Sequence, residues 1–176
     1  MWPFGPPSRP AGAGKMKELL TIRIATMRVV SRPAVLMCRG LGSCVGVAIW
    51  DPVRKVGGMA HILLPSEDSS VNREPELKFA DRGLIALVEA MEKRGCLRKD
   101  MRAKLAGGSR MFTSTTKSIV SVIGDRNVTA VKQVLQALGV AIAGEDTGGS
   151  KGRNMIFDTE DGSVTITTVM GEQYNI

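Results

Sequence analysis

Residues 40–65 read GLGSCVGVAIWDPVRKVGGMAHILLP, and this stretch decides the fold that we predict. Val45, Val47 and Ile49 alternate with small residues, which is typical of a β-strand. A second apolar run, 56–64, follows the sequence Asp-Pro-Val-Arg. Pro52 suits the second position of a four-residue turn because its φ is fixed near about −65°. The stretch therefore predicts an antiparallel β-hairpin.

The predicted turn places the only histidine of the chain opposite a cysteine. If residues 51–54 form the loop, Cys44 and His61 each lie seven residues from it along their strands, so they face each other. Facing residues of an antiparallel pair point to the same side, with Cβ atoms about 4.5–5.5 Å apart. A bulge at Gly57-Gly58 would shift the register by one residue and turn one side chain to the other face.

Length and composition describe one globular domain. The chain has 176 residues, of which 43% are hydrophobic and 23% charged. Residues 1–15 are rich in proline and glycine, so we expect a disordered leader before a single domain over 16–176. No apolar run approaches about 18 residues, which argues against membrane insertion. The three cysteines form no Cys-x-x-Cys pair, so we expect reduced thiols in a cytoplasmic protein.

The formal net charge of +7 favours an acidic partner, such as a nucleic acid, an anionic membrane or an acidic protein surface. The basic residues are spread along the chain, and aromatic residues make up only 4% of it. Because no helix-turn-helix, zinc-finger or aromatic RNA-binding signature is present, we expect no nucleic-acid partner.

Two helices are predicted from apolar stripes at helical spacing. The first covers 77–94 and ends at Gly95, and its stripe consists of Ala80, Leu84, Leu87, Val88 and Met91. The second begins at a cap formed by Asp125 or Asn127 and ends at Gly139.

Each predicted helix leads into a short strand and then a glycine loop. The strand 101–106 runs into Gly107-Gly108, and the strand 140–143 runs into 145–149. Further strands are expected within 17–30 and in a closing hairpin of 154–157 and 164–169. We therefore predict a layered α/β sandwich of mixed β-sheets with outer helices.

Cys44 and His61 are the candidate catalytic pair. A lone cysteine in an apolar strand is most often a packing residue, and a lone histidine is more often structural. Side by side they form what a thiol nucleophile needs, because the thiolate attacks and an imidazolium lowers the thiol pKa. A zinc site built from His61 with Cys38, Cys44 and Cys96 matches no metal motif, so we expect neither a metal nor a cofactor.

The hairpin sequence resembles the signature of the CheD family, the chemoreceptor glutamine deamidases of bacterial and archaeal chemotaxis. Further blocks resemble the family in the expected order, and the likeness runs from about residue 17 to the end. These blocks are 103–108 with Met111-Phe112, Ile123-Gly124 with Arg126-Asn127-Val128, 145–149, and Gly171-Glu172-Gln173. Several blocks in one order are a more specific signal than one short motif.

The resemblance implies a cysteine-dependent amidohydrolase, a protein-glutamine glutaminase of chemotaxis adaptation. Such enzymes convert glutamines on the cytoplasmic helices of chemoreceptors to glutamate and release ammonia. The nucleophile of the family maps onto Cys44 and its histidine onto His61. The implied fold is similar to that of glutamine-deamidating bacterial toxins, and the implied partner besides the receptor is CheC, a response-regulator phosphatase.

Backbone groups and glycine loops are expected to complete the site. The N–H groups near Ser43 and Cys44, left accessible by Gly42, would hold the oxyanion of an attacked carboxamide. The residues expected to shape the cleft are Gly107, Gly108, Asp146, Thr147 and Gly148, although these loops are equally well explained as simple turns. Phe112 is either an exposed docking residue or part of the core.

One position departs from the family pattern. The third catalytic residue of the family is a threonine six positions before the nucleophile, where this chain has Cys38. A thiol is a weak hydrogen-bond partner, so Cys38 would orient His61 poorly. Either another group orients the imidazole (Ser43, Thr147 or a backbone carbonyl) or the enzyme is slower. The departure also leaves a second function open, a catalytically weak adaptor that binds the receptor and the CheC phosphatase.

Overall fold

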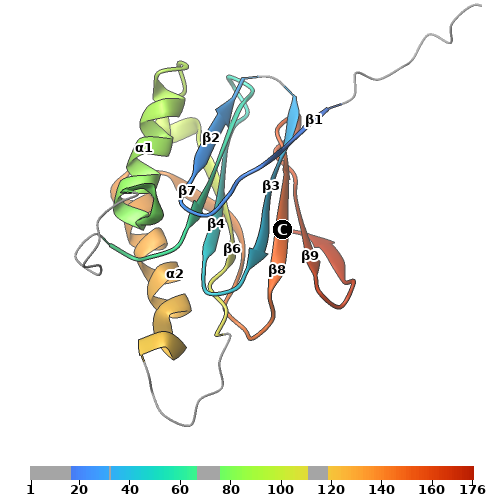
Figure 1. Ribbon diagram of the computed structural model, residues 1–176. Coiled ribbons are helices and arrows are strands. Elements are labelled where there is room, and N and C mark those ends of the chain that lie inside the picture. The colour runs from blue at the N-terminus through green and yellow to red at the C-terminus, as the bar shows by residue number, and fades with distance from the viewer. Residues whose placement is uncertain (1–16, 32, 67–75, 111–118) are drawn as a thin grey trace, which may run out of the picture.

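The computed structural model describes residues 17–31, 33–66, 76–110 and 119–176 (Figure 1). Two five-stranded sheets lie face to face, and the helices α1 (Ala80–Glu92) and α2 (Ile119–Ala137) cover the outer side of one of them. The predicted layered α/β sandwich of mixed sheets with outer helices is thereby confirmed. The predicted leader and Phe112 lie outside the described residues.

Sheet A has the strand order β1-β3-β8-β9-β10. β1 runs parallel to β3, and the other neighbours are antiparallel. Its strands are β1 (Glu18–Thr21), β3 (Ala34–Leu41), β8 (Arg153–Asp158), β9 (Val164–Thr168) and β10 (Gln173–Asn175). β8 and β9 confirm the predicted closing hairpin, whereas β10 has no counterpart in the prediction.

Sheet B has the order β2-β5-β4-β6-β7 and carries the hairpin β4-β5 at its centre. β6 and β7 are parallel neighbours joined across α2, since a parallel pair needs a long crossover. The strands are β2 (Met27–Val30), β4 (Val45–Asp51), β5 (Val56–Ile62), β6 (Arg102–Gly107) and β7 (Ala141–Thr147). Short 3₁₀ helices cover Glu76–Lys78 and Arg98–Asp100.

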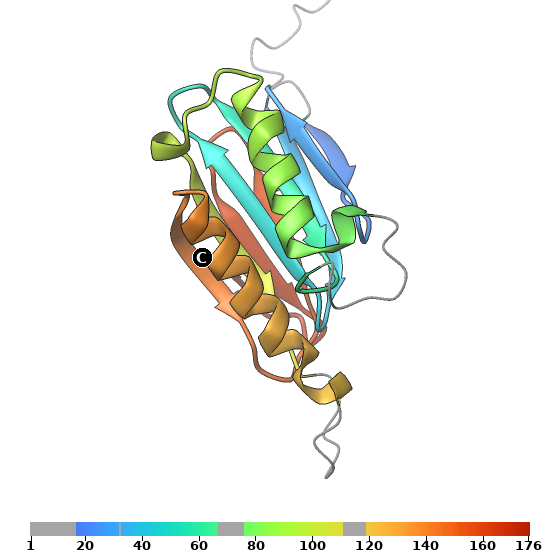
Figure 2. The same cartoon turned by 90° about the vertical axis from the view of Figure 1, so that its left-hand side faces the viewer.

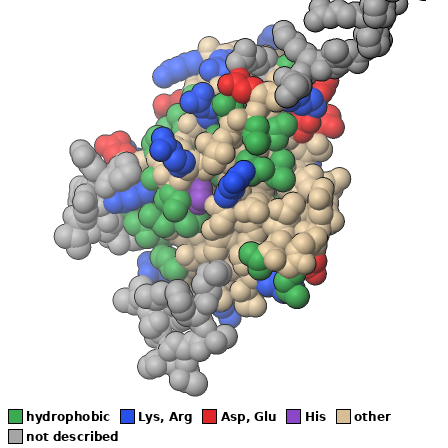
Figure 3. Space-filling model, turned by 45° about the vertical axis from the view of Figure 1, so that its right-hand side comes forward, with side chains coloured by type: hydrophobic (Ala, Val, Ile, Leu, Met, Phe, Trp, Pro, Cys, Tyr) green, Lys and Arg blue, Asp and Glu red, His purple; other side chains and the backbone are tan. Residues whose placement is uncertain are grey.

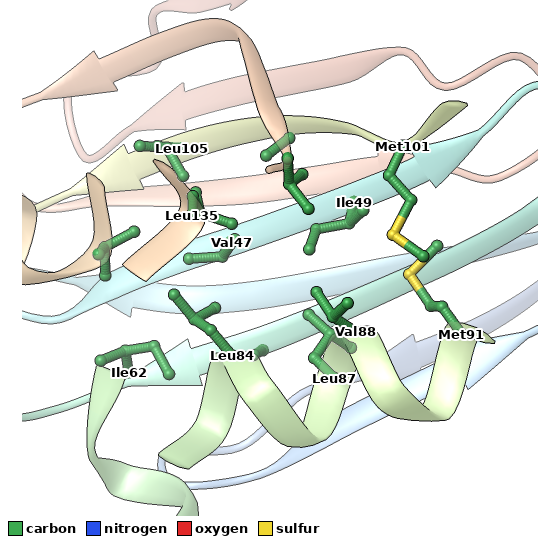
Figure 4. Close-up of a cluster of buried hydrophobic side chains, with 14 of the residues drawn as sticks. Val47, Ile49, Ile62, Leu84, Leu87, Val88, Met91, Met101, Leu105 and Leu135 are labelled. Atoms are coloured by element: carbon green, nitrogen blue, oxygen red, sulfur yellow. The ribbon is translucent and has the colours of Figure 1, made fainter. Parts of the chain in front are cut away.

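The helices hold sheet B from outside. Figure 2 shows α1 and α2 side by side across the face of this sheet. The whole predicted stripe of α1 is buried, and Leu84, Leu87 and Val88 point toward Val47 and Ile49 of β4 (Figure 4). Each such buried side chain contributes about 1.5–3 kcal/mol. The central hairpin is therefore held firmly on this side. Within the described ranges, no helix is long and apolar enough to span a membrane.

A second core fills the space between the two sheets, and β4 contributes to both cores. Val45 and Val47 belong to the cluster under the helices, whereas Cys44 and Ala48 belong to the cluster between the sheets. This alternation follows from the two-residue period of a strand. The Cys44 side of the hairpin therefore faces sheet A.

The predicted hairpin is confirmed, but its register differs. The prediction pairs Asp51 with Arg54 and leaves two residues between them, whereas Asp51 pairs with Val56, so four residues, 52–55, lie between the paired ends. The Asp51 carboxylate accepts hydrogen bonds from the N–H groups of Val53 and Arg54, at 2.8 and 3.0 Å. Lys55 adopts a φ of 55° and turns the chain back into β5, which begins at Val56.

The longer loop changes the predicted partner of His61. His61 faces Gly46, so the predicted direct pairing with Cys44 is wrong by two residues. A shift of two residues keeps every side chain on its predicted face. Cys44 and His61 consequently share one face as diagonal neighbours, a relation in which Cα atoms lie about 7–8 Å apart.

Two further boundaries differ from the prediction. α2 begins at Ile119, so Asp125 and Asn127 lie inside the helix rather than at its cap. β7 extends to Thr147, which pairs with Gly107 of β6, so Asp146 and Thr147 belong to a strand rather than a loop. In both cases the backbone hydrogen bonds of the element extend over polar residues. The prediction used only the spacing of apolar residues and therefore left these positions out.

Candidate active site

Cys44, His61 and Cys38 meet between the two sheets at one end of the hairpin. A Cβ atom added to Gly46, which faces His61, would lie 3.5 Å from Cβ of Cys38 on β3. Cys38 and Cys44 belong to the same buried cluster between the sheets. The three candidate residues are therefore brought together, although they come from three strands or strand ends.

His61 is held by the crossover segment between β1 and β2. Its backbone N–H donates to the Thr26 carbonyl at 3.1 Å, and its carbonyl accepts from the Ala25 N–H at 3.0 Å. Its ring Nδ1 lies 3.4 Å from the Ile22 carbonyl oxygen. A carbonyl can only accept, so we assign the proton of the neutral ring to Nδ1. Nε2 then carries a free lone pair, and it is buried without a hydrogen-bond partner among the described residues.

Burial sets the charge of the candidate pair. His61 is 2% and Cys44 8% exposed. Burial lowers the pKa of His61 below its ordinary value, against a smaller opposing effect of the Ile22 carbonyl. Burial also raises the pKa of the Cys44 thiol. The predicted thiolate–imidazolium pair is therefore not the resting state, and both groups are neutral near pH 7.

Cys38 does not orient the imidazole in this structure. It is fully buried, and its Sγ lies 3.9 Å from the carbonyl oxygen of Ala60, the residue before His61. Burial raises the pKa of its thiol far above the ordinary value. Of the alternatives to the family threonine, the backbone carbonyl, that of Ile22, is the one that contacts the ring.

The first glycine loop, residues 107–110, lies directly against residues 42–44, which we call the cysteine segment. Gly108 N–H donates to the Cys44 carbonyl and Ser109 N–H to the Gly42 carbonyl, both at 2.8 Å. Gly107 has a φ of 108°, and a Cβ atom there would lie 2.2 Å from the Cys44 carbonyl oxygen. Only glycine permits this approach, which fixes the backbone on either side of Ser43.

The second glycine loop, residues 148–151, is tied to the first. Gly148 N–H donates to the Gly107 carbonyl at 2.8 Å. The buried Arg153 pairs with Asp146 at 2.7 Å and also donates to the Gly148 carbonyl and to Ser109 Oγ. The predicted cleft residues therefore lie together beside Cys44, and Arg153 is the residue that binds them to one another.

Asn127 of α2 contacts the candidate site, although the sequence predicted for it only a place at a helix cap. It is fully buried, and its Nδ2 donates to the carbonyls of Ser43 at 2.8 Å and Leu63 at 2.9 Å. It thereby joins α2 to the cysteine segment and to the residue that follows β5. The available signal was an amide on the apolar stripe of α2, four residues before Val131.

A pocket of about 380 Å³ opens over His61. Its lining residues are Thr21, Ile22, Arg23, Ile24, Arg39 and His61. Figure 3 shows the histidine, in purple, reaching the surface between basic side chains in blue and apolar side chains in green. Cys44 does not line this pocket, so a side chain that enters it meets His61 first. Among the described residues, no cluster of three or more histidine, cysteine or acidic side chains is placed to hold a metal ion.

A cysteine and a histidine between the sheets of an α/β sandwich, beside two linked glycine loops, define a protein with a buried thiol–imidazole site. Residues 63–168 match the family model CheD, described as CheD chemotactic sensory transduction. The chain is 47% identical over 153 residues to a protein of Clostridium novyi (strain NT) named probable chemoreceptor glutamine deamidase CheD, covering 87% of this chain and 94% of that protein. The chain belongs to the CheD family.

Other similar proteins agree in name. The protein of the same name from Caldanaerobacter subterraneus subsp. tengcongensis is 43% identical over 152 residues, covering 86% of this chain and 94% of that protein. Among solved structures, a hypothetical protein YfiH from Bacillus licheniformis matches at a TM-score of 0.43 and 18% identity, covering 68% of this chain and 49% of that one. A likeness at this TM-score supports no inference.

Proposed function

We propose that this protein is a cytoplasmic amidohydrolase that converts specific glutamines of chemoreceptors to glutamate, with Cys44 as nucleophile and His61 as base. The observation that carries the proposal is the unpartnered Nε2 of His61 on the hairpin face that bears Cys44. The names of the relatives, chemoreceptor glutamine deamidases, supply the substrate class.

The reaction begins with a neutral pair. His61 Nε2 takes the proton from Cys44 Sγ as the sulfur attacks the glutamine carboxamide carbon and its C=O electrons move to the oxygen. The tetrahedral intermediate collapses, the C–N bond breaks, and the imidazolium protonates the nitrogen, which leaves as ammonia. Water, deprotonated by His61, then attacks the thioester. The C–S bond breaks, Cys44 regains its proton from His61, and glutamate is released.

The oxyanion of this intermediate needs preorganised donors. Burial raises the pKa of the Cys44 thiol, and the backbone N–H of Cys44 offsets part of this rise, which supports a donor beside the reacting sulfur. Gly42 and Ser43 precede it in a bend whose carbonyls are already engaged by Ser109 and Asn127. A donor of this kind typically contributes about 2.7–4 kcal/mol to the transition state.

The burial of Cys44 adds a requirement. Because the thiol is 8% exposed and does not line the pocket, substrate binding must displace neighbouring groups before attack. We expect the partners to be the helical cytoplasmic part of a chemoreceptor and a CheC-type phosphatase. Two features favour one alternative, an adaptor that binds both partners with little catalysis. These are the burial of Cys44 and the presence of Cys38 where a threonine is expected.

A deamidation assay separates the two functions. A recombinant cytoplasmic fragment of a chemoreceptor from the same organism is incubated with the wild-type protein, Cys44→Ala and His61→Ala, and glutamine sites are followed by mass spectrometry. Deamidation adds about 1 Da to each target, as expected for hydrolysis of a thioester, and we expect it with the wild type alone. Equal rates for Cys44→Ala and wild type would refute the proposed chemistry, and binding without a mass change would favour the adaptor.

A further inference from the structure

We propose that Arg23 and Arg39 select target glutamines that have an acidic residue one helical turn away. This inference rests on the proposed function and concerns which glutamines the same site accepts. It starts from the charge of the pocket over His61, where these two arginines are the only charged lining side chains among the residues that the structure describes.

The two arginines are free to bind a carboxylate. Both are exposed, and neither forms an ion pair with any carboxylate in the described part of the chain. Arg39 Nε lies 3.1 Å from the Met37 sulfur, a weak acceptor. By contrast, Arg98, Arg110 and Arg153 each have an acidic partner.

The arginines come from two different segments that line the pocket. Arg23 belongs to the crossover after β1, next to the Ile22 carbonyl that contacts the His61 ring, and Arg39 belongs to β3. Ile24, which is 53% exposed, supplies an apolar contact on the same rim. A side chain that reaches Nε2 of His61 therefore brings its neighbours within reach of two guanidinium groups.

A helical substrate fits this charge pattern. Residues three and four positions apart on a helix are surface neighbours, with Cβ atoms about 5–6 Å apart. If the target glutamine enters the pocket, an aspartate or glutamate one turn away lies over its rim. Guanidinium groups bind carboxylates through paired charge-assisted hydrogen bonds, whereas a lysine at that position would be repelled.

The test uses matched substrates and matched variants. Chemoreceptor fragments with a single target glutamine carry Glu, Gln or Lys at one of the positions three or four residues before or after it. Each is assayed for binding to Cys44→Ala by fluorescence anisotropy and for deamidation by the active protein. The variants are Arg23→Gln, Arg39→Gln and the charge reversal Arg39→Glu. The control is Arg54→Gln, which changes an exposed arginine in the loop at the opposite end of the hairpin.

We expect the wild type to prefer Glu over Gln by about fivefold at one or more of the four positions, the effect of one exposed charge pair, and to disfavour Lys. Arg23→Gln or Arg39→Gln should flatten this preference, Arg39→Glu should improve the Lys fragment, and Arg54→Gln should change nothing. Equal affinity and rate for the three fragments at all four positions would overturn the inference. Loss of all deamidation with the charge preference in binding intact would instead count against the proposed function.

Discussion

At the residue scale, burial decides the charge that Cys44 and His61 carry. Both side chains lie between the sheets, where the charged form of either group loses its hydration. The imidazole is held by the Ile22 carbonyl through Nδ1, so the ring is oriented without the threonine hydroxyl that we expected in place of Cys38. In the proposed reaction both groups therefore start neutral, and proton transfer begins only when a substrate binds.

The first prediction concerns the pH dependence of stability. Burial lowers the pKa of folded His61, while in the unfolded chain it is about 6.5. As the pH falls, the unfolded chain binds the proton first, so the free energy of unfolding should decrease from about pH 6.5 through the lower folded pKa. Urea titrations between pH 7.5 and 5 should show this slope in the wild type and a shallower one in His61→Asn. Identical slopes would show that His61 is not buried in its neutral form.

The second prediction concerns Cys38. Its Sγ lies 3.9 Å from the Ala60 carbonyl, at the limit of a sulfur hydrogen bond. In Cys38→Thr a hydroxyl replaces the thiol and can donate a shorter bond to the strand that carries His61. We expect kcat/KM for deamidation to rise by about 2- to 10-fold, equivalent to one neutral hydrogen bond. Cys38→Val has nearly the same shape as threonine without the hydroxyl, so an equal gain there would point to packing instead.

At the element scale, the site depends on how α2 and the glycine loops are joined to the hairpin. Asn127 connects α2 with Ser43 and Leu63, and Gly108 and Ser109 connect the end of β6 with Cys44 and Gly42. These bonds engage backbone carbonyls on both sides of Ser43. The geometry of the cysteine segment is therefore set by its neighbours more than by its own sequence.

The third prediction tests the Asn127 connection. In Asn127→Asp an acceptor replaces the amide that donates to two carbonyls, which should destabilise the protein by about 2–5 kcal/mol. Because the change displaces Ser43, we expect kcat/KM to fall by more than tenfold while the protein is still folded. Val131→Ala, in the buried stripe one turn later, removes core contacts at a cost of about 1–3 kcal/mol and should keep kcat/KM. Equal losses of activity in the two variants would make Asn127 a structural residue alone.

The fourth prediction tests the close approach at Gly107. In Gly107→Ala the new Cβ would lie 2.2 Å from the Cys44 carbonyl oxygen, at a φ of 108°. The backbone must move, so we expect deamidation to fall at least about tenfold, in addition to about 1–3 kcal/mol of lost stability. Gly139→Ala is the control, because Gly139 has a φ of 71° but nothing within 4 Å of the added Cβ. Thermal unfolding and deamidation rates of the two variants separate strain from displacement of the site.

At the scale of the whole molecule, the local sequence patterns predicted individual helices and strands but not how these elements pair and pack. The hairpin, the buried stripe of α1 and the strands β6, β8 and β9 follow from periodicities within single segments. The longer connection between β4 and β5 shifted their pairing register by two residues. Because side chains alternate with a period of two, Cys44 and His61 still share one face.

The remaining features depend on partners distant in sequence, which a periodicity does not identify. The parallel pairing of β1 with β3 and the contact of Ile22 with the His61 ring are of this kind. So is Arg153, which links two loops because it is buried beside Asp146. Asn127 is a polar residue inside an apolar pattern, and its hydrogen bonds to Ser43 and Leu63 are likewise not predicted by that pattern.

The position of β8 in sheet A has a consequence for protein synthesis. Cys44 and His61 leave the ribosome 17 residues apart, but the arginine that locks both glycine loops is residue 153, and the strand that carries it pairs with β3. Domains generally fold as units. Because the contacts of Arg153 cannot form before residue 153 has been synthesised, we expect a nascent or prematurely terminated chain to lack the deamidase activity proposed for the complete protein.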